Sequence, residues 1–364
     1  MKRKQVLLVG EYSGVHKHLK LGLKELGIDT RIISDGDRWK AIGGNDYPLR
    51  YPFSESYNRW LRAYSYVLSP IIYIFKYRLG GYQVVQFMDL LRYYPMKFRR
   101  FIFWLYKLFN KKLVICAAGN NNVVYDAYRK GAYRYFVYNG LSKEKRFSND
   151  YEQNVDYDLA RRAEKVIPIA YEYAEAFRIS LQNPRNLGKA IPAPIHLELF
   201  PYKENKLNEK MVIFHGLNEF PEIKGTEIII RAMEKFKESH QDDVELILKG
   251  GVPFAEYMDI VYSANIVIDQ CMSYCTGLSG LFPLATGRIV MGGAEQENLD
   301  ELGMEESPII NILPNEEDIL EKLEMLYNRR DGFTQMGHAS RVFVEKYHDS
   351  LKVARQYLEA WGLS

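Results

Sequence analysis

The sequence predicts an α/β protein made of two consecutive doubly wound domains. Its 364 residues exceed the usual size of a single hydrophobic core, so two domains are expected. Short continuous apolar runs alternate with segments of helical apolar spacing, and this alternation restarts after a proline-rich, polar interruption at 183–210. Continuous apolar runs are typical of strands buried on both faces of a parallel sheet. Each half is therefore predicted to form a parallel sheet covered by helices.

The first half opens with a strand, a helix and a second strand. The apolar run at 6–9 ends at Gly10, leucines from Leu19 to Leu26 predict a helix that ends at Gly27, and 30–33 forms the next strand. Further strands are expected at 82–87, 113–117 and 166–169, with helices at 96–109 and 173–180. We expect this domain to span residues 1–185.

The second half repeats the pattern. Strands are expected at 211–216, 245–249, 266–269, 288–291 and 309–312, with helices after Lys224-Gly225-Thr226, at 255–262 and between Gly277 and Gly287. Helices near 315–328, 332–345 and 348–360 follow. We expect the second domain to span 186–345 and the end of the chain, 346–364, to pack back toward the first domain.

Charge divides between the two halves. Residues 1–200 contain 33 Lys+Arg and 18 Asp+Glu, a net charge of +15, whereas residues 201–364 contain 16 and 28, a net charge of −12. Such a split indicates that the halves meet different partners. Three cysteines, Cys116, Cys271 and Cys275, do not form a disulfide framework, and without a His pair nearby they predict buried thiols rather than zinc ligands.

Polar residues gather in the second half where strands end and helices begin. His215-Gly216-Leu217-Asn218 ends one strand, Asp269 ends another, and Lys224 stands at a helix start. The turn Gly277-Leu278-Ser279-Gly280 leads into a further helix. A helix start with a lysine beside it favours anions, and ligands of doubly wound sheets bind at the carboxyl ends of the strands. This stretch therefore predicts a site for a nucleotide diphosphate.

These features together resemble the GT-B glycosyltransferases. The likeness rests on the two halves, the glycine-rich first loop, Lys224-Gly225 at a helix start and the glycine-bounded helix from Gly277 to Gly287. The second half is most similar to family-4 retaining enzymes of bacterial polysaccharide synthesis. The resemblance implies two Rossmann-like domains facing a central cleft. It also implies that Lys224 contacts the donor diphosphate and that the turn with Gly277, Ser279 and Gly280 cradles it, with His215, Gly216 and Asn218 beside it.

The sequence departs from the family at its best-known signature, Glu-x7-Glu. Registering the helix on Gly277 and Gly287 places the two glutamates at Tyr274 and Phe282, and neither is acidic. A subfamily with other donor contacts, a degenerate protein or a register error would each explain the difference. Glu295 and Glu297 follow the next strand, and we assign Glu295 a catalytic role and Glu297 a donor contact. The alternative is that both glutamates belong to a solvated helix start.

In the first half, the resemblance implies an acceptor side. Gly10-Glu11-Tyr12-Ser13-Gly14 leads to a helix start. A lone glycine loop is a weak signal, so it is the resemblance that implies a ligand contact at Gly14. His16 is assigned to the acceptor site, whereas His18 is expected on the helix surface. Asp89 is the candidate catalytic residue, since it follows the strand at 82–87. Asn120 and Asn121, in the turn after 113–118, can bind sugar hydroxyls but cannot act as bases.

A basic and aromatic stretch runs from Arg92 to Lys112. It contains seven basic and eight aromatic residues and no acidic one, which is the composition of a helix in a membrane interface. The uncharged run at 63–75 is too short to span a bilayer. A buried helix with only its basic residues exposed, or a surface for single-stranded nucleic acid, would give the same composition. We expect peripheral contact with an anionic membrane and no nucleic-acid partner.

The sequence thus predicts a glycosyltransferase that moves a sugar from a nucleotide-diphosphate donor to a lipid-linked or polysaccharide acceptor of a cell-surface glycan. No cofactor and no metal ion are expected, because Lys224 with helix amides would stabilise the leaving diphosphate. The apolar run after Met1-Lys2-Arg3-Lys4 is too short for a signal peptide, so the inner face of the cytoplasmic membrane is the expected location. The alternatives are a catalytically silent GT-B scaffold and a GT-B sugar-nucleotide epimerase.

Overall fold

A computed structural model describes residues 5–37, 42–135, 149–218 and 221–363, and divides the chain into two compact units. Unit 1 contains Met1–Ala132, Ser142–Pro194 and Ser350–Ser364, and unit 2 contains Tyr133–Leu141 and Ile195–Asp349. Each unit has one sheet, and every strand pair in both sheets is parallel. The predicted α/β class with two parallel-sheet domains is confirmed.

The sheet of unit 1 has six strands in the order β3-β2-β1-β4-β5-β6. Their bounds are Val6–Val9 for β1, Thr30–Ser34 for β2, Tyr47–Pro48 for β3, Val84–Met88 for β4, Lys112–Ala117 for β5 and Lys165–Pro168 for β6. All residues of β1 and β4 are buried, as expected for central strands covered on both faces. The carboxyl ends of these two neighbouring strands therefore meet at one edge of the sheet.

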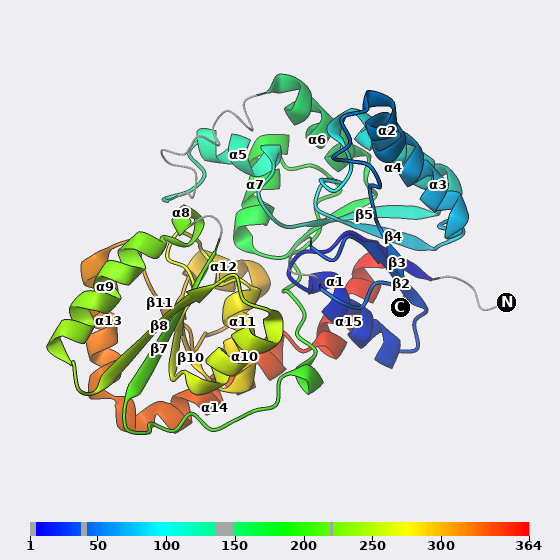
Figure 1. The fold of residues 1–364 in the computed structure, drawn as a ribbon. Helices are drawn as coiled ribbons and strands as arrows, with labels where there is room; N and C mark the ends of the chain where they lie inside the picture. The colour runs from blue at the N-terminus through cyan, green and yellow to red at the C-terminus, as the bar shows by residue number, and fades with distance from the viewer. Residues whose placement is uncertain (1–4, 38–41, 136–148, 219–220, 364) are drawn as a thin grey trace. The chain divides into compact units, whose positions relative to one another are not determined.

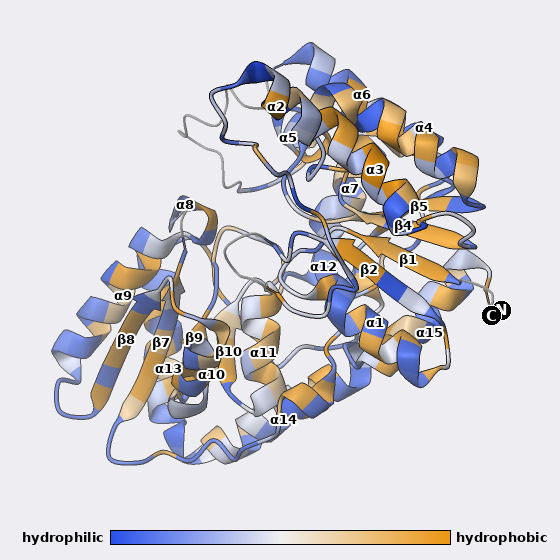
Figure 2. Ribbon diagram, turned by 45° about the vertical axis from the view of Figure 1, so that its right-hand side comes forward, coloured by the Kyte–Doolittle hydropathy of each residue, from blue (hydrophilic) through white to orange (hydrophobic). Residues whose placement is uncertain are grey.

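Helices cover both faces of this sheet. Helix α1 (Val15–Glu25) packs with α15 (Ser350–Trp361) on one face, and α3 (Ser69–Lys76), α4 (Arg99–Phe109) and α6 (Asp150–Arg162) lie on the other (Figures 1 and 2). The remaining helical elements are α2 (Arg59–Ala63), a π-helical turn at Tyr64–Leu68, a 3-10 turn at Met96–Phe98, α5 (Asn122–Arg129) and α7 (Tyr171–Leu181). None of the described helices is long and apolar enough to cross a bilayer.

The sheet of unit 2 has five strands in the order β11-β10-β9-β7-β8. They are β7 (Met211–Leu217), β8 (Val244–Gly250), β9 (Ile266–Ile268), β10 (Ile289–Gly292) and β11 (Ile310–Asn311). The helices are α8 (Pro221–Lys224), α9 (Thr226–Ser239), α10 (Phe254–Ser263), α11 (Leu278–Thr286), α12 (Gln296–Leu302), α13 (Glu316–Asn328) and α14 (Phe333–Tyr347), with 3-10 turns at Leu197–Leu199 and Arg330–Gly332. Apolar residues of β7, β9, β10, α9 and α13 form its core.

Candidate functional site

The buried carboxylate of Asp269 organises the carboxyl end of the sheet in unit 2. Asp269 follows β9 directly, and its side chain is fully buried. Its Oδ1 accepts hydrogen bonds from Lys224 Nζ at 2.9 Å and Ser279 Oγ at 2.7 Å. Its Oδ2 accepts from Thr276 Oγ1 at 2.8 Å and the Gly277 amide at 2.9 Å. Burial alone would raise the pKa of Asp269, but Lys224 and these hydrogen bonds lower it to about 2.

Lys224 is held at the junction between two helices. Lys224 ends α8, and Gly225, which precedes α9 as its N-cap, has φ +73°. A Cβ on Gly225 would lie 2.3 Å from Cys271 Sγ, so the close packing of this junction requires glycine. The Lys224 side chain is 12% exposed, and its ammonium lies beside Gly216, whose added Cβ would be 4.0 Å from Nζ. Two of the predicted donor-site residues, Lys224 and Gly216, are thereby brought together.

The glycine turn at the start of α11 uses some of its amides internally. The Gly277 amide donates to Asp269, and the Gly280 amide donates to the Gly277 carbonyl at 2.9 Å. Within the described part of the chain, the amides of Leu278 and Ser279 have no acceptor, as is usual for the first turn of a helix. The positive end of α11 therefore still presents two donors next to Lys224 and Asp269.

His215 is buried between the strands and α9. Its Nδ1 lies 2.8 Å from the Ile268 carbonyl oxygen, and its Nε2 lies 3.0 Å from Thr226 Oγ1. Burial lowers the pKa of His215 to about 4, so the ring is neutral at pH 7 and both of its nitrogens are engaged within the protein. His215 therefore positions the start of α9, whereas Asn218, after β7, is exposed.

The two glutamates after β10 meet an arginine that sequence reasoning missed. Arg134 Nη2 lies 3.0 Å from Glu295 Oε2 and 2.9 Å from Glu297 Oε1. Glu295 also accepts hydrogen bonds from the Tyr135 hydroxyl and, at 3.2 Å, from Asn311 Nδ2. Arg134 precedes Glu295 by 161 residues, and no local sequence pattern connects them. Glu295 and Glu297 are therefore an ion-paired cluster at the start of α12.

Tyr274 and Phe282 occupy the positions that the family pattern gives to glutamates. The Tyr274 hydroxyl accepts a hydrogen bond from the Arg134 amide at 2.9 Å, and its ring stacks on Tyr135 with centroids 5.4 Å apart. Phe282 stacks on Phe200 at 4.8 Å and is 6% exposed. Tyr274 thus holds the segment 133–135 on unit 2, and Phe282 is part of the hydrophobic core.

In unit 1, the predicted glycine loop is filled by its own glutamate. The buried carboxylate of Glu11 accepts hydrogen bonds from the amides of Gly14 at 3.2 Å, His16 at 3.1 Å and Lys17 at 2.8 Å. Burial raises the pKa of Glu11 to about 7, although these hydrogen bonds oppose the shift. The start of α1, where Gly14 precedes the helix, is therefore occupied by a side chain of the protein.

His16 and His18 are both buried rather than exposed at a ligand surface. His16 Nδ1 lies 2.8 Å from the Gly10 carbonyl oxygen and Nε2 lies 3.3 Å from Gln86 Nε2. Burial lowers the pKa of His16 to about 4. The expectation that His18 lies on the helix surface is wrong, because its side chain is buried.

Asp89 and Asn121, which the sequence assigned separately, lie together at the carboxyl ends of β4 and β5. Asn121 Nδ2 donates to Asp89 Oδ1 at 2.7 Å, and the Tyr12 hydroxyl donates to Oδ2 at 3.2 Å. Asp89 is fully buried with φ +56°, and burial raises its pKa despite the nearby Arg92. Asn121 also caps α5, while Asn120 beside it is partly exposed. Among the described residues, no three His, Cys, Asp or Glu side chains could hold a metal ion.

Comparison with known proteins identifies the fold. No protein-family profile matches the sequence, and no curated protein matches it. Sucrose-phosphate synthase from Thermosynechococcus elongatus matches with a TM-score of 0.67 and 16% identity over 99% of this chain and 100% of that one. HepE from Anabaena, solved with UDP-glucose, matches with a TM-score of 0.63 and 12% identity over 98% and 99%.

A third solved structure, a putative UDP-N-acetylglucosamine 2-epimerase from Listeria monocytogenes, matches with a TM-score of 0.54 and 12% identity over 98% of this chain and 95% of that one. These likenesses extend over nearly the whole chain. They confirm the predicted GT-B fold, whereas assignment to family 4 stays a prediction.

Proposed function

We propose that the chain is a glycosyltransferase whose nucleotide-diphosphate sugar binds in unit 2 at Lys224 and the start of α11. The observation that carries the proposal is the Asp269 carboxylate, which fixes both the ammonium and the glycine turn at the carboxyl ends of β7 and β9. Ligands of doubly wound sheets bind at such strand ends. The neighbours with the same fold include one solved with UDP-glucose.

The chemistry follows from the charges. An ammonium has three N–H bonds, and Asp269 takes one from Lys224, so two are left for phosphate oxygens. The free amides of Leu278 and Ser279 add the positive end of α11. Groups that are fixed before the reaction stabilise charge on the departing diphosphate more strongly than water does. Transfer is therefore proposed to proceed without a metal ion, with unchanged turnover in EDTA as its test.

The test is a binding experiment with UDP as the probe. Lys224→Ala removes the cation and is expected to weaken UDP binding at least tenfold, about 1.4 kcal/mol, measured by calorimetry. Lys235→Ala is the matched control, because Lys235 lies on α9 and is 55% exposed. If the wild type binds neither UDP nor GDP, ADP or CMP, or if both variants bind alike, the proposed site fails.

The acceptor is proposed to be a lipid-linked or polysaccharide chain at the inner face of the cytoplasmic membrane, with residues 92–112 in contact with the membrane. Asp89 and Glu295 are proposed as catalytic residues, and His16, Asn120 and Asn121 as the acceptor side. Asp89→Asn and Glu295→Gln are then expected to lower turnover of UDP-glucose while UDP still binds. The anomeric configuration of the product, read by NMR, tests the proposed retaining transfer.

An epimerase is the second candidate, because a putative sugar-nucleotide 2-epimerase has the same fold over nearly the full chain. Both reactions start from a bound nucleotide sugar, so UDP binding alone does not separate them. Incubation with UDP-N-acetylglucosamine in the absence of an acceptor separates the two reactions. A new sugar nucleotide would favour the epimerase, and binding without turnover of any sugar nucleotide would favour the silent scaffold.

A further inference from the structure

One exposed face of unit 1 combines apolar and basic side chains, and we call it the aromatic-basic face. It is formed by α2, the π-helical turn, α3 and α4 (Figure 2). Helix α2 buries none of its residues, and Phe75 of α3 contacts Phe109 at the end of α4 with ring centroids 5.8 Å apart. Its exposed apolar side chains are Trp60, Leu61, Leu68, Ile72, Phe75, Phe101, Trp104, Leu108 and Phe109.

Helix α4 shows why this face is unusual. Ile102, Phe103, Leu105 and Tyr106 point into unit 1 and are buried. The opposite side of a surface helix is normally polar, yet here Trp104 is 54% and Leu108 59% exposed. More than half of the exposed large apolar side chains of the described residues lie between Phe53 and Phe109. An apolar patch of this kind indicates an interaction site.

The charge of the face selects an anionic partner. Between Asn58 and Asn110 the only acidic residue is Asp89, which is fully buried. The exposed basic residues of the same stretch are Arg59, Arg62, Lys76, Arg78, Lys97, Arg100 and Lys107. Exposed tryptophan together with lysine and arginine is the composition of a surface that lies in the headgroup region of an anionic membrane.

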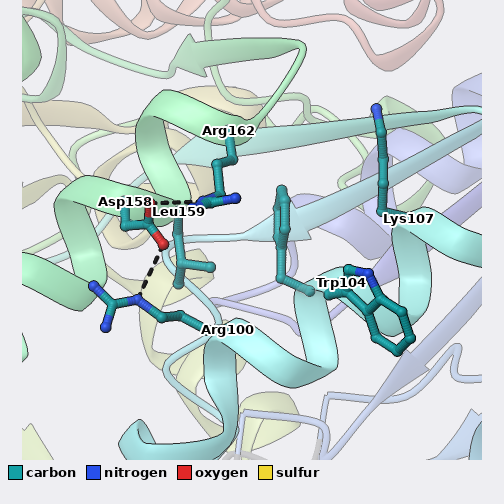
Figure 3. A pocket seen from close by; sticks show the side chains of 7 residues that line it. Arg100, Trp104, Lys107, Asp158, Leu159 and Arg162 are labelled. Atoms are coloured by element: carbon teal, nitrogen blue, oxygen red, sulfur yellow. Dashed lines mark hydrogen bonds and ion pairs between the residues drawn. The ribbon is translucent and has the colours of Figure 1, made fainter.

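A pocket at the edge of this face has the character of a headgroup site. It lies between α4 and α6, has a volume of about 380 Å³, and is lined by Arg100, Phe103, Trp104, Lys107, Asp158, Leu159 and Arg162 (Figure 3). Arg100 Nε lies 3.0 Å and Arg162 Nε 2.6 Å from the two oxygens of Asp158. Two guanidinium groups thus share one carboxylate, while Lys107 pairs with Glu164. The lining thus contains three cations and one carboxylate, together with apolar Phe103 and Leu159.

We propose that the aromatic-basic face docks on an anionic phospholipid membrane, with a lipid phosphate at Arg100 and Arg162 and with Trp60 and Trp104 in the interface. This extends the contact at 92–112 to α2 and α3 and assigns a headgroup site between α4 and α6. Each basic residue near an anionic surface strengthens membrane binding about fivefold. The attachment is therefore reversible and sensitive to salt.

The experiment is co-sedimentation of the full chain, without nucleotide, with vesicles of phosphatidylcholine alone or mixed with phosphatidylglycerol. Binding is expected only to the mixed vesicles and is expected to fall as salt is raised. Trp60→Ser with Trp104→Ser should abolish most of the binding and the blue shift of tryptophan emission. Val342→Ser changes a 44% exposed apolar residue of unit 2. It should change neither the vesicle binding nor the tryptophan emission.

The pocket is tested by Arg100→Gln with Arg162→Gln, which should weaken vesicle binding about tenfold or more, since two basic contacts are lost. Arg231→Gln with Lys235→Gln is the matched control, because these two exposed cations also share one carboxylate, Glu316. Circular dichroism and UDP binding should be unchanged in all variants. The docking face rests on the membrane contact in the proposed function, but vesicle binding needs no nucleotide, so its failure is separate from failure of the nucleotide-sugar site in unit 2.

Three results would overturn the proposal. The first is equal binding to both kinds of vesicle, or none to either. The second is a thermal stabilisation by glycerol 3-phosphate, without vesicles, that the Arg100 and Arg162 substitutions abolish, because the pocket would then bind a soluble anion. The third is tighter binding to single-stranded RNA than to the mixed vesicles.

Discussion

Two carboxylates, Glu11 and Asp269, lie at helix starts where the sequence predicts a bound ligand. Glu11 accepts the first amides of α1, which leaves no such donors for a ligand there. Asp269 takes only part of the donors around α11 and fixes Lys224 beside the rest. The sequence shows glycines, a lysine and helix starts equally in both halves. It does not show which carboxylate folds back onto which helix, because that depends on tertiary contacts between distant residues.

Asp269→Asn tests this arrangement. The amide would present N–H groups toward Lys224 or Ser279, which are themselves donors, and would leave the 12% exposed ammonium without its partner. Loss of one member of a buried pair costs about 3 kcal/mol, so the free energy of unfolding in urea should fall by that order. Asp242→Asn, at an exposed position of the same unit, should leave it unchanged. Equal stability of both variants would show that Asp269 does not organise the site.

At the scale of helices and strands, buried strands were predicted well, whereas some helices were missed. The apolar runs at 6–9, 113–117 and 266–268 lie in strands, because an uninterrupted apolar run fits a central parallel strand. No element was predicted at 59–63, 122–129 or 150–162, where α2, α5 and α6 lie. Helix α2 has no buried side to give its sequence a helical period. The segment 133–135 carries no pattern that predicts its contact with Tyr274.

The packing of α1 on α15 gives a prediction at this scale. A Cβ on Gly22 would lie 2.1 Å from the Ser350 carbonyl oxygen, which belongs to the backbone and cannot move aside alone. Gly22→Ala should therefore separate the two helices and lower the free energy of unfolding by about 2 kcal/mol. Gly43→Ala has open space around its Cβ and should have no such effect. A thermal melt of both variants makes the comparison, and an unchanged Gly22→Ala melt would contradict this packing.

At the scale of the whole molecule, the shifted pKa values predict different responses of the two units to acid. In unit 2, the pKa of His215 is lowered to about 4 and that of Asp269 to about 2. In unit 1, the pKa of His16 is lowered to about 4, but the pKa values of Glu11 and Asp156 are raised to about 7 and 6. Between pH 7 and 4, Glu11 and Asp156 bind protons more readily in the folded than in the unfolded state, and the histidines less readily.

Unit 2 should consequently lose stability first as the pH falls. The His215 contribution is fully present above pH 6.5 and is lost toward pH 4, at about 1.4 kcal/mol per unit of pKa difference. In unit 1, the gain from Glu11 and Asp156 opposes the loss at His16. Urea unfolding at pH 7 and at pH 5 can be monitored by hydrogen exchange in peptides from each unit. The free energy of unfolding of unit 2 should be lower at pH 5 than at pH 7. His215→Gln should reduce the pH dependence of unit 2, and an unchanged dependence would rule out His215 as its source.

Helix α15 has a consequence for how the protein is made. It supplies Val353, Tyr357, Leu358 and Trp361 to the core of unit 1, and Trp361 Nε1 donates to Gln86 Oε1 at 3.1 Å. Those residues leave the ribosome after all of unit 2. Unit 2 can therefore fold during synthesis before unit 1 is complete, because the side of α1 that packs on α15 stays uncovered until α15 has been made.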